Sequence, residues 1–285
     1  MPAISEPAIF TSNADSGKPR LWTAIILAGQ RPEGDPMAAY CNVKHKALIP
    51  INGQTMLERV VRALNACPDV GRIVVMAQSP EALKTGLSAD LANEDGIAFV
   101  ASGDGIATSI HDVIGTAVAP WPVLVTTADN ALLTGEILDC FFRAHGGQDL
   151  AVAVVERRTM FAAYPNTRRT WLKFRGGAYS GANLFAFYNS AAKPAVAFWS
   201  AVEKDRKKGW KIFAHFGPWL LFRALSQTIG FSQAMAQAGQ RMGLRAVPII
   251  LPIAEAAIDV DKPSDLELVT GILTRRENGA SALCK

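Results

Sequence analysis

The sequence predicts an α/β protein built on a largely parallel sheet. Short apolar runs that end in polar or glycine-containing segments alternate with amphipathic helical stretches over about the first 155 residues, the order expected of βαβ units. Hydrophobic residues make up 49% of the 285 residues and charged residues 19%, a balance that allows the chain to bury a core. The length fits one large α/β domain.

Order is expected to begin at Trp22. Residues 1–20 are rich in Ser, Pro, Asp and Gly, a composition typical of a mobile leader. We therefore expect a single domain over residues 21–285, with a first half at about 21–155 and a second half at about 156–285.

Five buried strands are expected in the first half. Each is a short apolar run of the kind found in strands that are covered on both faces, at 23–28, 72–77, 99–101, 123–127 and 149–155. Between the first two, Thr55 and Glu58 form a T-x-x-E capping box, and apolar residues then recur on one face. This pattern predicts an amphipathic helix that starts at Thr55 and ends before Pro68.

The second half differs from the first in composition. A basic stretch at 168–175 precedes a glycine-rich segment at 176–181, and a helical, aromatic and basic stretch follows through residue 216. We expect an apolar strand at 247–252 and a last helix after Pro263.

Charge and composition exclude several function classes. The net charge of +4 is too small for a protein that coats nucleic acid, but it is compatible with polyanionic small substrates or an anionic membrane surface. The four scattered cysteines contain no CxxC pair, so neither a zinc site nor a disulfide framework is expected. The first 20 residues lack the charged segment followed by an apolar segment that is typical of a signal peptide. No apolar run approaches the length of about 20 residues that a membrane span needs. We therefore expect a cytoplasmic location.

The first candidate site residues follow the first strand. Glycine after a buried strand, as in Leu27-Ala28-Gly29, lets backbone N–H groups approach phosphates, although many strands end in glycine for purely structural reasons. Lys46 lies in the same connection, beside an apolar stretch that needs no charge. A lysine there would hold a triphosphate and stabilise charge on the transferring phosphoryl group, and Arg31 within the loop would assist.

Acidic residues that follow predicted strands are candidate metal ligands. Asp129 comes directly after the strand at 123–127, at the edge where open α/β sheets place ligands; a helix cap is the alternative. Asp259 and Asp261 lie on the same side of an extended segment, where two carboxylates repel unless a cation offsets them. Magnesium uses one or two carboxylates together with substrate phosphates. The alternative for Asp259 and Asp261 is that both cap the following helix or pair with basic residues. Asp265 is interpreted as a first-turn acid of the last helix.

Taken in order, four segments resemble the MobA-like nucleotidyltransferase superfamily, which includes molybdenum-cofactor guanylyltransferase and the sugar-phosphate and alcohol-phosphate nucleotidyltransferases. They are Leu27-Ala-Gly29, His45-Lys46-Ala-Leu with Gly53, Thr127-Ala-Asp129, and Asp259-Val-Asp261-Lys-Pro-Ser-Asp265-Leu. The resemblance implies a Rossmann-like three-layer sandwich with a mixed, mostly parallel sheet, the GT-A-like fold. The first half would bind the NTP, and the second half would supply the acceptor side.

The resemblance also implies roles for single residues. The loop at 27–29 would wrap the triphosphate, and Lys46 would contact phosphate. Asp129 would hold Mg²⁺ or Mn²⁺, and Asp261, in preference to Asp259, would complete the metal site.

The sequence departs from the family pattern in the first loop, which has a single glycine, Gly29, where two are usual. Ser109 sits where relatives have a serine that opens a helix near the nucleotide, and a simple helix cap is the alternative. Ser180, Gly181 and Asn183 resemble the segment that lines the acceptor side in relatives, and an ordinary turn before an apolar strand is the alternative.

The basic stretch of the second half also has two interpretations. Arg168, Arg169, Lys173 and Arg175 would face an anionic acceptor or, more commonly for charges at this density, form a solvated surface. His215 is interpreted as structural, because an acceptor phosphate is already ionised and needs little deprotonation.

The function expected from these residues is metal-dependent transfer of NMP from an NTP to a small phosphorylated acceptor, such as a precursor of a lipid head group, with release of pyrophosphate. One alternative is a GT-A-type glycosyltransferase that uses a nucleotide sugar, and another is a non-catalytic nucleotide-binding protein on the same scaffold. No nucleic acid partner is expected. The residues do not specify the base, the acceptor or the oligomeric state.

Overall fold

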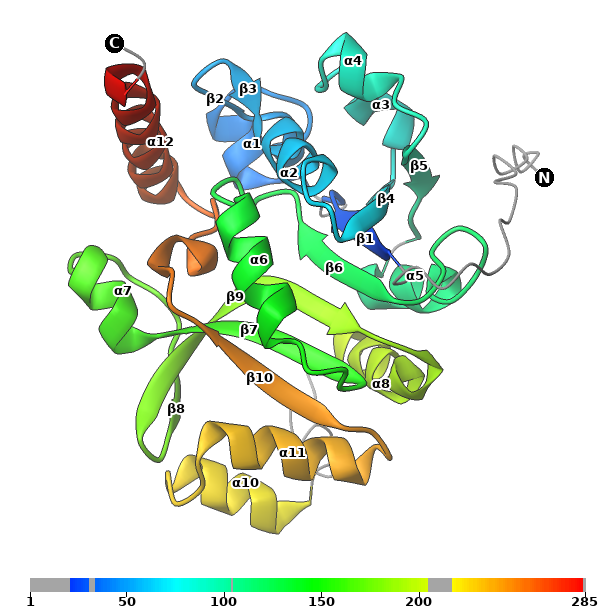
Figure 1. Cartoon of the computed structure of the whole chain (residues 1–285), viewed down its shortest axis with the longest axis vertical. Coiled ribbons are helices and arrows are strands. Elements are labelled where there is room, and N and C mark those ends of the chain that lie inside the picture. Colours follow the sequence, from blue (N-terminus) through cyan, green and yellow to red (C-terminus); the bar gives the residue numbers. More distant parts are fainter. Residues whose placement is uncertain (1–20, 31–33, 104, 205–216, 284–285) are drawn as a thin grey trace.

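The computed structural model of the protein describes residues 21–30, 34–103, 105–204 and 217–283 (Figure 1). The expected leader at 1–20, Arg31, His215 and the end of the helical stretch predicted up to residue 216 lie outside the described residues.

The centre of the molecule is an eight-stranded sheet with the order β10-β7-β9-β6-β1-β4-β5, in which β8 pairs with β9. Its strands are β1 (Trp22–Leu27), β4 (Val70–Ala77), β5 (Ile97–Ala101), β6 (Val123–Thr127), β7 (Leu150–Glu156), β8 (Leu172–Phe174), β9 (Gly177–Phe187) and β10 (Ala246–Leu251). A separate hairpin pairs β2 (Pro50–Ile51) with β3 (Gln54–Thr55). Strands from both halves of the sequence therefore share one sheet.

The sheet is mixed but mostly parallel. β6, β1, β4 and β5 run parallel to one another, and so do β7 and β10, whereas β9 lies antiparallel between β6 and β7. The predicted α/β class with a mostly parallel mixed sheet is confirmed.

Helices cover both faces of this sheet (Figure 1). The α-helices are α1 (Pro36–Tyr40), α2 (Met56–Asn65), α3 (Pro80–Lys84), α4 (Ala89–Ala92), α5 (Ile106–Val113), α6 (Gly135–Ala144), α7 (Arg157–Ala163), α8 (Lys193–Lys204), α10 (Pro218–Leu225), α11 (Phe231–Arg241) and α12 (Pro263–Leu283). Short 3₁₀ helices are η1 (Lys46–Leu48), η2 (Ser190–Ala192) and η3 (Ala254–Ala257). The predicted last helix after Pro263 is α12.

Two hydrophobic clusters lie on the two faces of the sheet. Along β1, Ala24 and Ile26 belong to the larger cluster with α2, α6 and α12, whereas Ile25 belongs to the smaller cluster with α5 and α8. Because successive side chains of a strand point to opposite faces, a strand with a helix layer on each side needs an unbroken apolar run. This explains why the apolar runs identified the central strands.

Two local predictions are corrected by the structure. Thr55 caps α2 as expected, since its hydroxyl accepts from the N–H of Glu58 at 3.1 Å, but the Glu58 carboxylate pairs with Arg62 at 2.7 Å. The alternative interpretation of Ser180 and Gly181 as an ordinary turn before a strand is wrong, because both lie inside the long strand β9. The strand starts at Gly177, where the hairpin from β8 brings the chain back into the sheet.

Candidate active site at the carboxyl edge of the sheet

The loop after β1 is closed by a side chain from the neighbouring strand. Gln78 directly follows β4, and its amide accepts from the N–H of Gln30 at 3.0 Å and donates to the carbonyl of Gln30 at 3.1 Å. A Cβ at Gly29 would lie 3.1 Å from the Gln78 amide oxygen. A residue without a side chain therefore fits best at position 29, because the Gln78 amide packs directly against it. The sequence prediction missed Gln78, although its place at the end of a buried strand was a usable signal.

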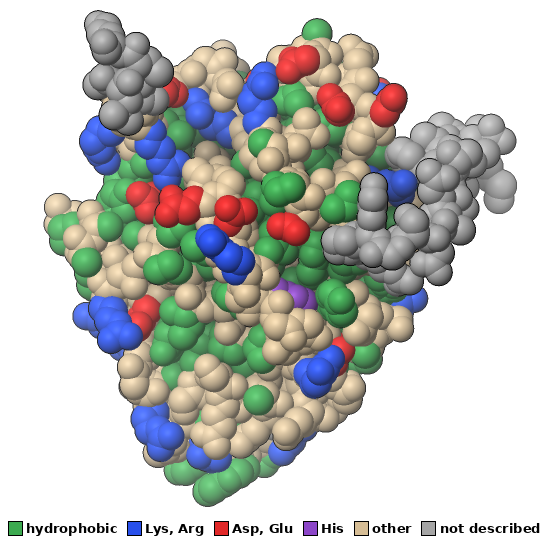
Figure 2. Space-filling view, in the orientation of Figure 1, with side chains coloured by type: hydrophobic (Ala, Val, Ile, Leu, Met, Phe, Trp, Pro, Cys, Tyr) green, Lys and Arg blue, Asp and Glu red, His purple; other side chains and the backbone are tan. Residues whose placement is uncertain are grey.

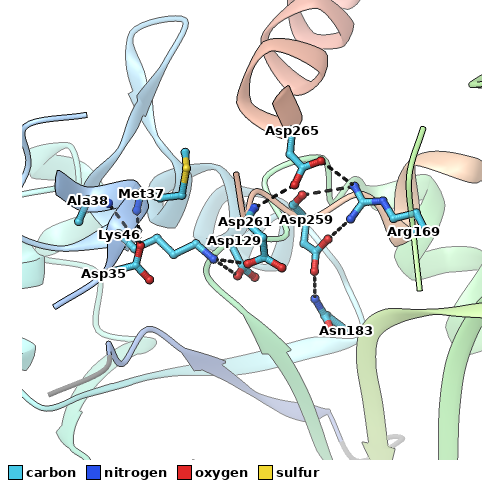
Figure 3. A network of polar contacts seen from close by, with 10 residues as sticks. All are labelled: Asp35, Met37, Ala38, Lys46, Asp129, Arg169, Asn183, Asp259, Asp261 and Asp265. Carbon is cyan, nitrogen blue, oxygen red and sulfur yellow. Dashed lines mark hydrogen bonds and ion pairs between the residues drawn. The ribbon is translucent and has the colours of Figure 1, made fainter. Parts of the chain in front are cut away.

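The next segment brings Lys46 to the same edge. Asp35 caps α1, since its carboxylate accepts from the N–H groups of Met37 at 2.8 Å and Ala38 at 3.3 Å. The chain then turns through η1, which begins at Lys46. This short helix presents the Lys46 ammonium to the region beyond the ends of β1 and β6 (Figure 3).

The Lys46 ammonium joins two carboxylates that are far apart in the sequence. It lies 2.7 Å from Asp129 Oδ2 and 2.6 Å from Asp261 Oδ1 (Figure 3). Burial lowers the pKa of Lys46, but the two carboxylates more than offset this effect, so the pKa stays raised and the side chain is charged. The arrangement is a cation held between two anions.

Asp129 is positioned by the backbone around the end of β6. The N–H of Ala128 donates to the carbonyl of Leu27 at 3.0 Å, which ties this turn to the first loop. Asn130 is buried, and its amide donates to the carbonyl of Ala182 on β9 at 3.3 Å. The Asp129 carbonyl accepts from the N–H of Val260 at 3.3 Å, which brings the acidic segment near the C-terminus alongside.

Asp259 and Asp261 have different partners. Asp259 contacts Arg169 Nη1 through Oδ1 and accepts from Asn183 Nδ2 at 3.3 Å through Oδ2 (Figure 3). Burial raises the pKa of Asp259, and the Arg169 guanidinium offsets part of this rise. The Asp261 side chain is 62% exposed, and its backbone N–H donates to Asp265 Oδ2 at 3.3 Å. The Asp261 side chain is thus more exposed to solvent than that of Asp259.

Arg169 does not belong to a solvated surface. Its side chain is only 8% exposed, and it also lies 3.9 Å from Asp265. The solvated interpretation is therefore wrong for this residue, because its partners come from a segment 90 residues later that the local sequence does not reveal. Arg168, Lys173 and Arg175 are exposed. Asp265 lies in the first turn of α12, as predicted.

Asn183 is aimed at Asp259 by an irregularity of β9. Its φ is +50°, a left-handed conformation that Asn tolerates better than most residues. The pairing register of β9 with β7 shifts at this place, as in a β-bulge. Among the other predicted acceptor residues, Ser180 is buried, and a Cβ at Gly181 would meet no described atom within 4 Å.

Ser109 does not open a helix. α5 begins at Ile106 after the N-cap residue Gly105, so Ser109 lies in the fourth position, and both the opening role and the simple cap are corrected. Its buried hydroxyl donates to the Gly105 carbonyl at 2.7 Å and accepts from the Gly103 N–H at 2.9 Å. It therefore fixes the loop between β5 and α5.

The carboxylates at this edge fit a divalent cation. Asp129 Oδ1 is buried and has no hydrogen-bond partner among the described residues, and the same holds for the hydroxyl of Thr127. No group of three or more His, Cys, Asp and Glu side chains in the described part of the chain is arranged as a metal site. Two carboxylates are nevertheless sufficient for magnesium, which keeps waters and substrate phosphates as its other ligands. Asp129 and Asp261 would hold the ion.

Comparisons with known proteins place the chain in a family. The sequence matches the MobA-like NTP transferase domain over residues 24–227. A hypothetical transferase of Thermus thermophilus has a similar structure, with a TM-score of 0.73 and 25% identity over 87% of this chain and 100% of that one. The 4-diphosphocytidyl-2C-methyl-D-erythritol synthase of Anaerococcus prevotii has a TM-score of 0.52 and 11% identity over 90% of this chain and 99% of that one. No curated protein sequence gives a significant match.

The family match covers most of the chain, including most of β1, Lys46, Asp129 and β9. The elements α11, β10, η3 and α12 lie beyond its end, as do Asp259 and Asp261. The structure brings Asp261 back to Lys46, which also contacts Asp129. The chain belongs to the MobA-like NTP transferase family and is a nucleotidyltransferase.

Proposed function

We propose that the protein transfers NMP from an NTP to a small phosphorylated acceptor in a reaction that depends on a divalent metal. One observation carries the proposal: Lys46 from the loop after β1 meets Asp129 and Asp261 at the carboxyl edge of the sheet. A cation next to carboxylates with free oxygen atoms suits a site that receives a metal together with a triphosphate.

In this reaction an oxygen of the acceptor phosphate attacks the α-phosphorus of the NTP. The bond from the α-phosphorus to the bridging oxygen breaks, and pyrophosphate leaves with the electron pair. Lys46 would contact phosphate oxygens and stabilise the charge that builds up on the leaving group. A magnesium ion on Asp129 and Asp261 would neutralise further phosphate charge. No general base is needed, because the acceptor phosphate is already ionised.

The acceptor is proposed to enter beside β9. Gly181 leaves open space at the strand surface, and Asn183 lies close to Asp259. Ser180 is buried in the sheet, which gives it a structural rather than a direct part in this binding. The division into an NTP-binding half and an acceptor half, and the cytoplasmic location, stay predictions.

One screen tests which nucleobase the NTP carries and which acceptor the protein uses. The cytidylyl chemistry in the name of the Anaerococcus prevotii enzyme belongs to a protein that is only 11% identical, so it guides the choice of candidates and does not fix the base. Each of the four NTPs is incubated with a panel of phosphorylated sugars and alcohols and magnesium, and pyrophosphate is measured. Release that requires both an NTP and an acceptor supports the proposal.

The control variant in this assay is Asp129→Asn, which keeps the size of the side chain and removes its charge. We expect turnover to fall at least ~100-fold while the fold is retained, since one anionic ligand of the metal is lost. Near-normal turnover with unchanged magnesium dependence would contradict the assignment. Release of UDP or GDP from a nucleotide sugar, without pyrophosphate formation from any NTP, would favour the glycosyltransferase alternative. Nucleotide binding without turnover would favour the non-catalytic one.

A further inference from the structure

Helix α10 exposes an apolar face at one end of the molecule. Its inner side packs through Leu220 and Ala224 in a small cluster with Ile229 and Ala234, against Phe174 of β8. On the outer side, Trp219, Phe222 and Leu225 follow one another at intervals of three residues; we call these three residues the α10 face.

The α10 face is unusually exposed for large apolar side chains. Trp219 is 65% exposed, Phe222 58% and Leu225 71%, and the rings of Trp219 and Phe222 stack with centroids 5.7 Å apart. Single exposed apolar residues are normal, but a contiguous group that includes tryptophan marks a surface that contacts something else.

The charge of the sequence is strongly segregated toward this part of the chain. Residues 157–254 contain fifteen Lys and Arg but only two acidic residues, whereas the rest of the sequence contains fourteen Lys and Arg and twenty-three acidic residues. The small overall net charge of +4 hides this division. The part of the chain that carries α10 therefore favours an anionic partner.

Three of these basic residues lie on or beside α10 in the structure. Arg223 lies on α10 itself, and the guanidinium of Arg241 at the end of α11 lies against Gly217 at the start of α10. Arg175 follows β8, and its backbone N–H donates to the Ile229 carbonyl just after α10. β8, α10 and α11 contain no acidic residue. Figure 2 shows hydrophobic side chains at the lower end of the molecule with basic ones nearby.

We propose that the α10 face docks on an anionic lipid bilayer. The aromatic and aliphatic side chains enter the boundary between head groups and acyl chains, and the neighbouring arginines contact anionic head groups. This contact is peripheral, since no helix in the described ranges is long and apolar enough to cross a membrane. The proposal does not rest on nucleotidyl transfer, because the α10 face is separate from the site at Lys46.

The same charges disfavour other occupants of the α10 face. In a symmetric dimer formed through this face, the arginines of both copies would be brought together and would repel one another. An apolar face of a helix also offers little to a nucleic acid backbone, whereas a bilayer accepts both its apolar centre and its basic margin.

The test is co-sedimentation of the full chain with vesicles of phosphatidylcholine alone and with vesicles that also contain phosphatidylglycerol. The variant Trp219→Ser/Phe222→Ser/Leu225→Ser removes the apolar contact, and Arg175→Gln/Arg223→Gln/Arg241→Gln removes the charge contact. The matched control is Tyr40→Ser, since Tyr40 is 64% exposed and lies on α1 at the opposite end of the molecule (Figure 1).

The wild type should bind the anionic vesicles at least about tenfold more tightly than the neutral ones, and salt should weaken this binding. Each triple variant should lose at least about tenfold in binding, while Tyr40→Ser binds like the wild type. Thermal unfolding checks that the variants are folded. Equal binding of wild type and the serine variant would overturn the proposal. A dimer that the serine substitutions dissociate, or binding of single-stranded RNA through the same residues without vesicle binding, would also overturn it.

Discussion

Arg169→Met tests whether the guanidinium holds the acidic segment in place. The methionine keeps most of the apolar stem and removes the charge. The loss leaves the Asp259 carboxylate, which is 25% exposed, with the Asn183 amide at 3.3 Å as its remaining side-chain donor among the described residues. It also removes a charge 3.9 Å from the buried Asp265. Removing one partner of a buried pair typically costs about 3–5 kcal/mol. Because Asp259 retains some water contact, we expect a loss in unfolding free energy of about 2–4 kcal/mol.

The pH dependence of this loss follows from the Asp259 carboxyl. Burial already raises the pKa of Asp259, and removal of Arg169 takes away the main effect that lowers it. A carboxyl with a raised pKa in the folded state binds a proton more readily than in the unfolded state. The cost of the substitution is therefore small below the ordinary pKa of an aspartate and grows as the pH rises through the raised one. Arg169→Met should be closer to the wild type at acidic than at alkaline pH.

The assay is urea unfolding followed by circular dichroism in the presence of EDTA, for the wild type, Arg169→Met, Asp259→Asn and the double variant. The double variant removes both charges, so it should recover most of the stability lost in Arg169→Met, with a coupling energy of about 2 kcal/mol. If Arg169→Met loses less than about 1 kcal/mol, or if the double variant is no more stable than Arg169→Met, the pair does not hold this segment.

Three further outcomes are expected. Lys46→Ala should raise the KM for NTP and lower kcat, each by about tenfold or more, and unchanged steady-state constants would show that Lys46 does not contact the triphosphate. Asp261→Ala should lower turnover much more than Asp259→Ala, with partial recovery at high magnesium; the reverse order would assign the metal to Asp259. Burial among aromatic rings lowers the pKa of His145, so the wild type should lose stability as the pH falls below about 6.5, where the unfolded chain is protonated first. His145→Leu should lose less stability than the wild type between neutral and acidic pH by urea unfolding, and equal losses would refute this origin.

The sequence was sufficient to predict the fold class and the elements that meet at the site. The apolar runs of β1, β4, β6 and β7 are continuous because helices cover both faces, so their pattern reports a buried parallel sheet. Parallel strands end at one edge, and residues that directly follow them are therefore neighbours. This is why the loop after β1 and Asp129 after β6 were expected at the same edge of the sheet. The contact of Lys46 with Asp129 was not predicted, and the chemical roles of both residues stay predictions.

What the sequence did not reveal depends on contacts between distant segments. Arg169 lies in a basic run that looks solvated, and its burial follows only from the partners near the C-terminus. Asn183 points to Asp259 because β9 changes register against β7, and no local pattern encodes that shift. Gln78 closes over Gly29 from the adjacent strand. Each case requires the register or the packing of two elements, which periodicity within one element does not contain.

The position of Lys46 bears on how two acidic residues are kept together at the site. Asp129 at the end of β6 and Asp261 in the segment before α12 both lie within 2.7 Å of the Lys46 ammonium. Two carboxylates that share one neighbour repel each other unless a cation lies between them. The Lys46 ammonium supplies that cation from a third segment and so neutralises the carboxylates. In the proposed reaction the same ammonium would also contact the triphosphate. These two roles differ in their ligand dependence, because neutralisation acts without nucleotide and phosphate contact acts only with it. The stability of Lys46→Ala without nucleotide therefore reports the first role, and its KM for NTP reports the second.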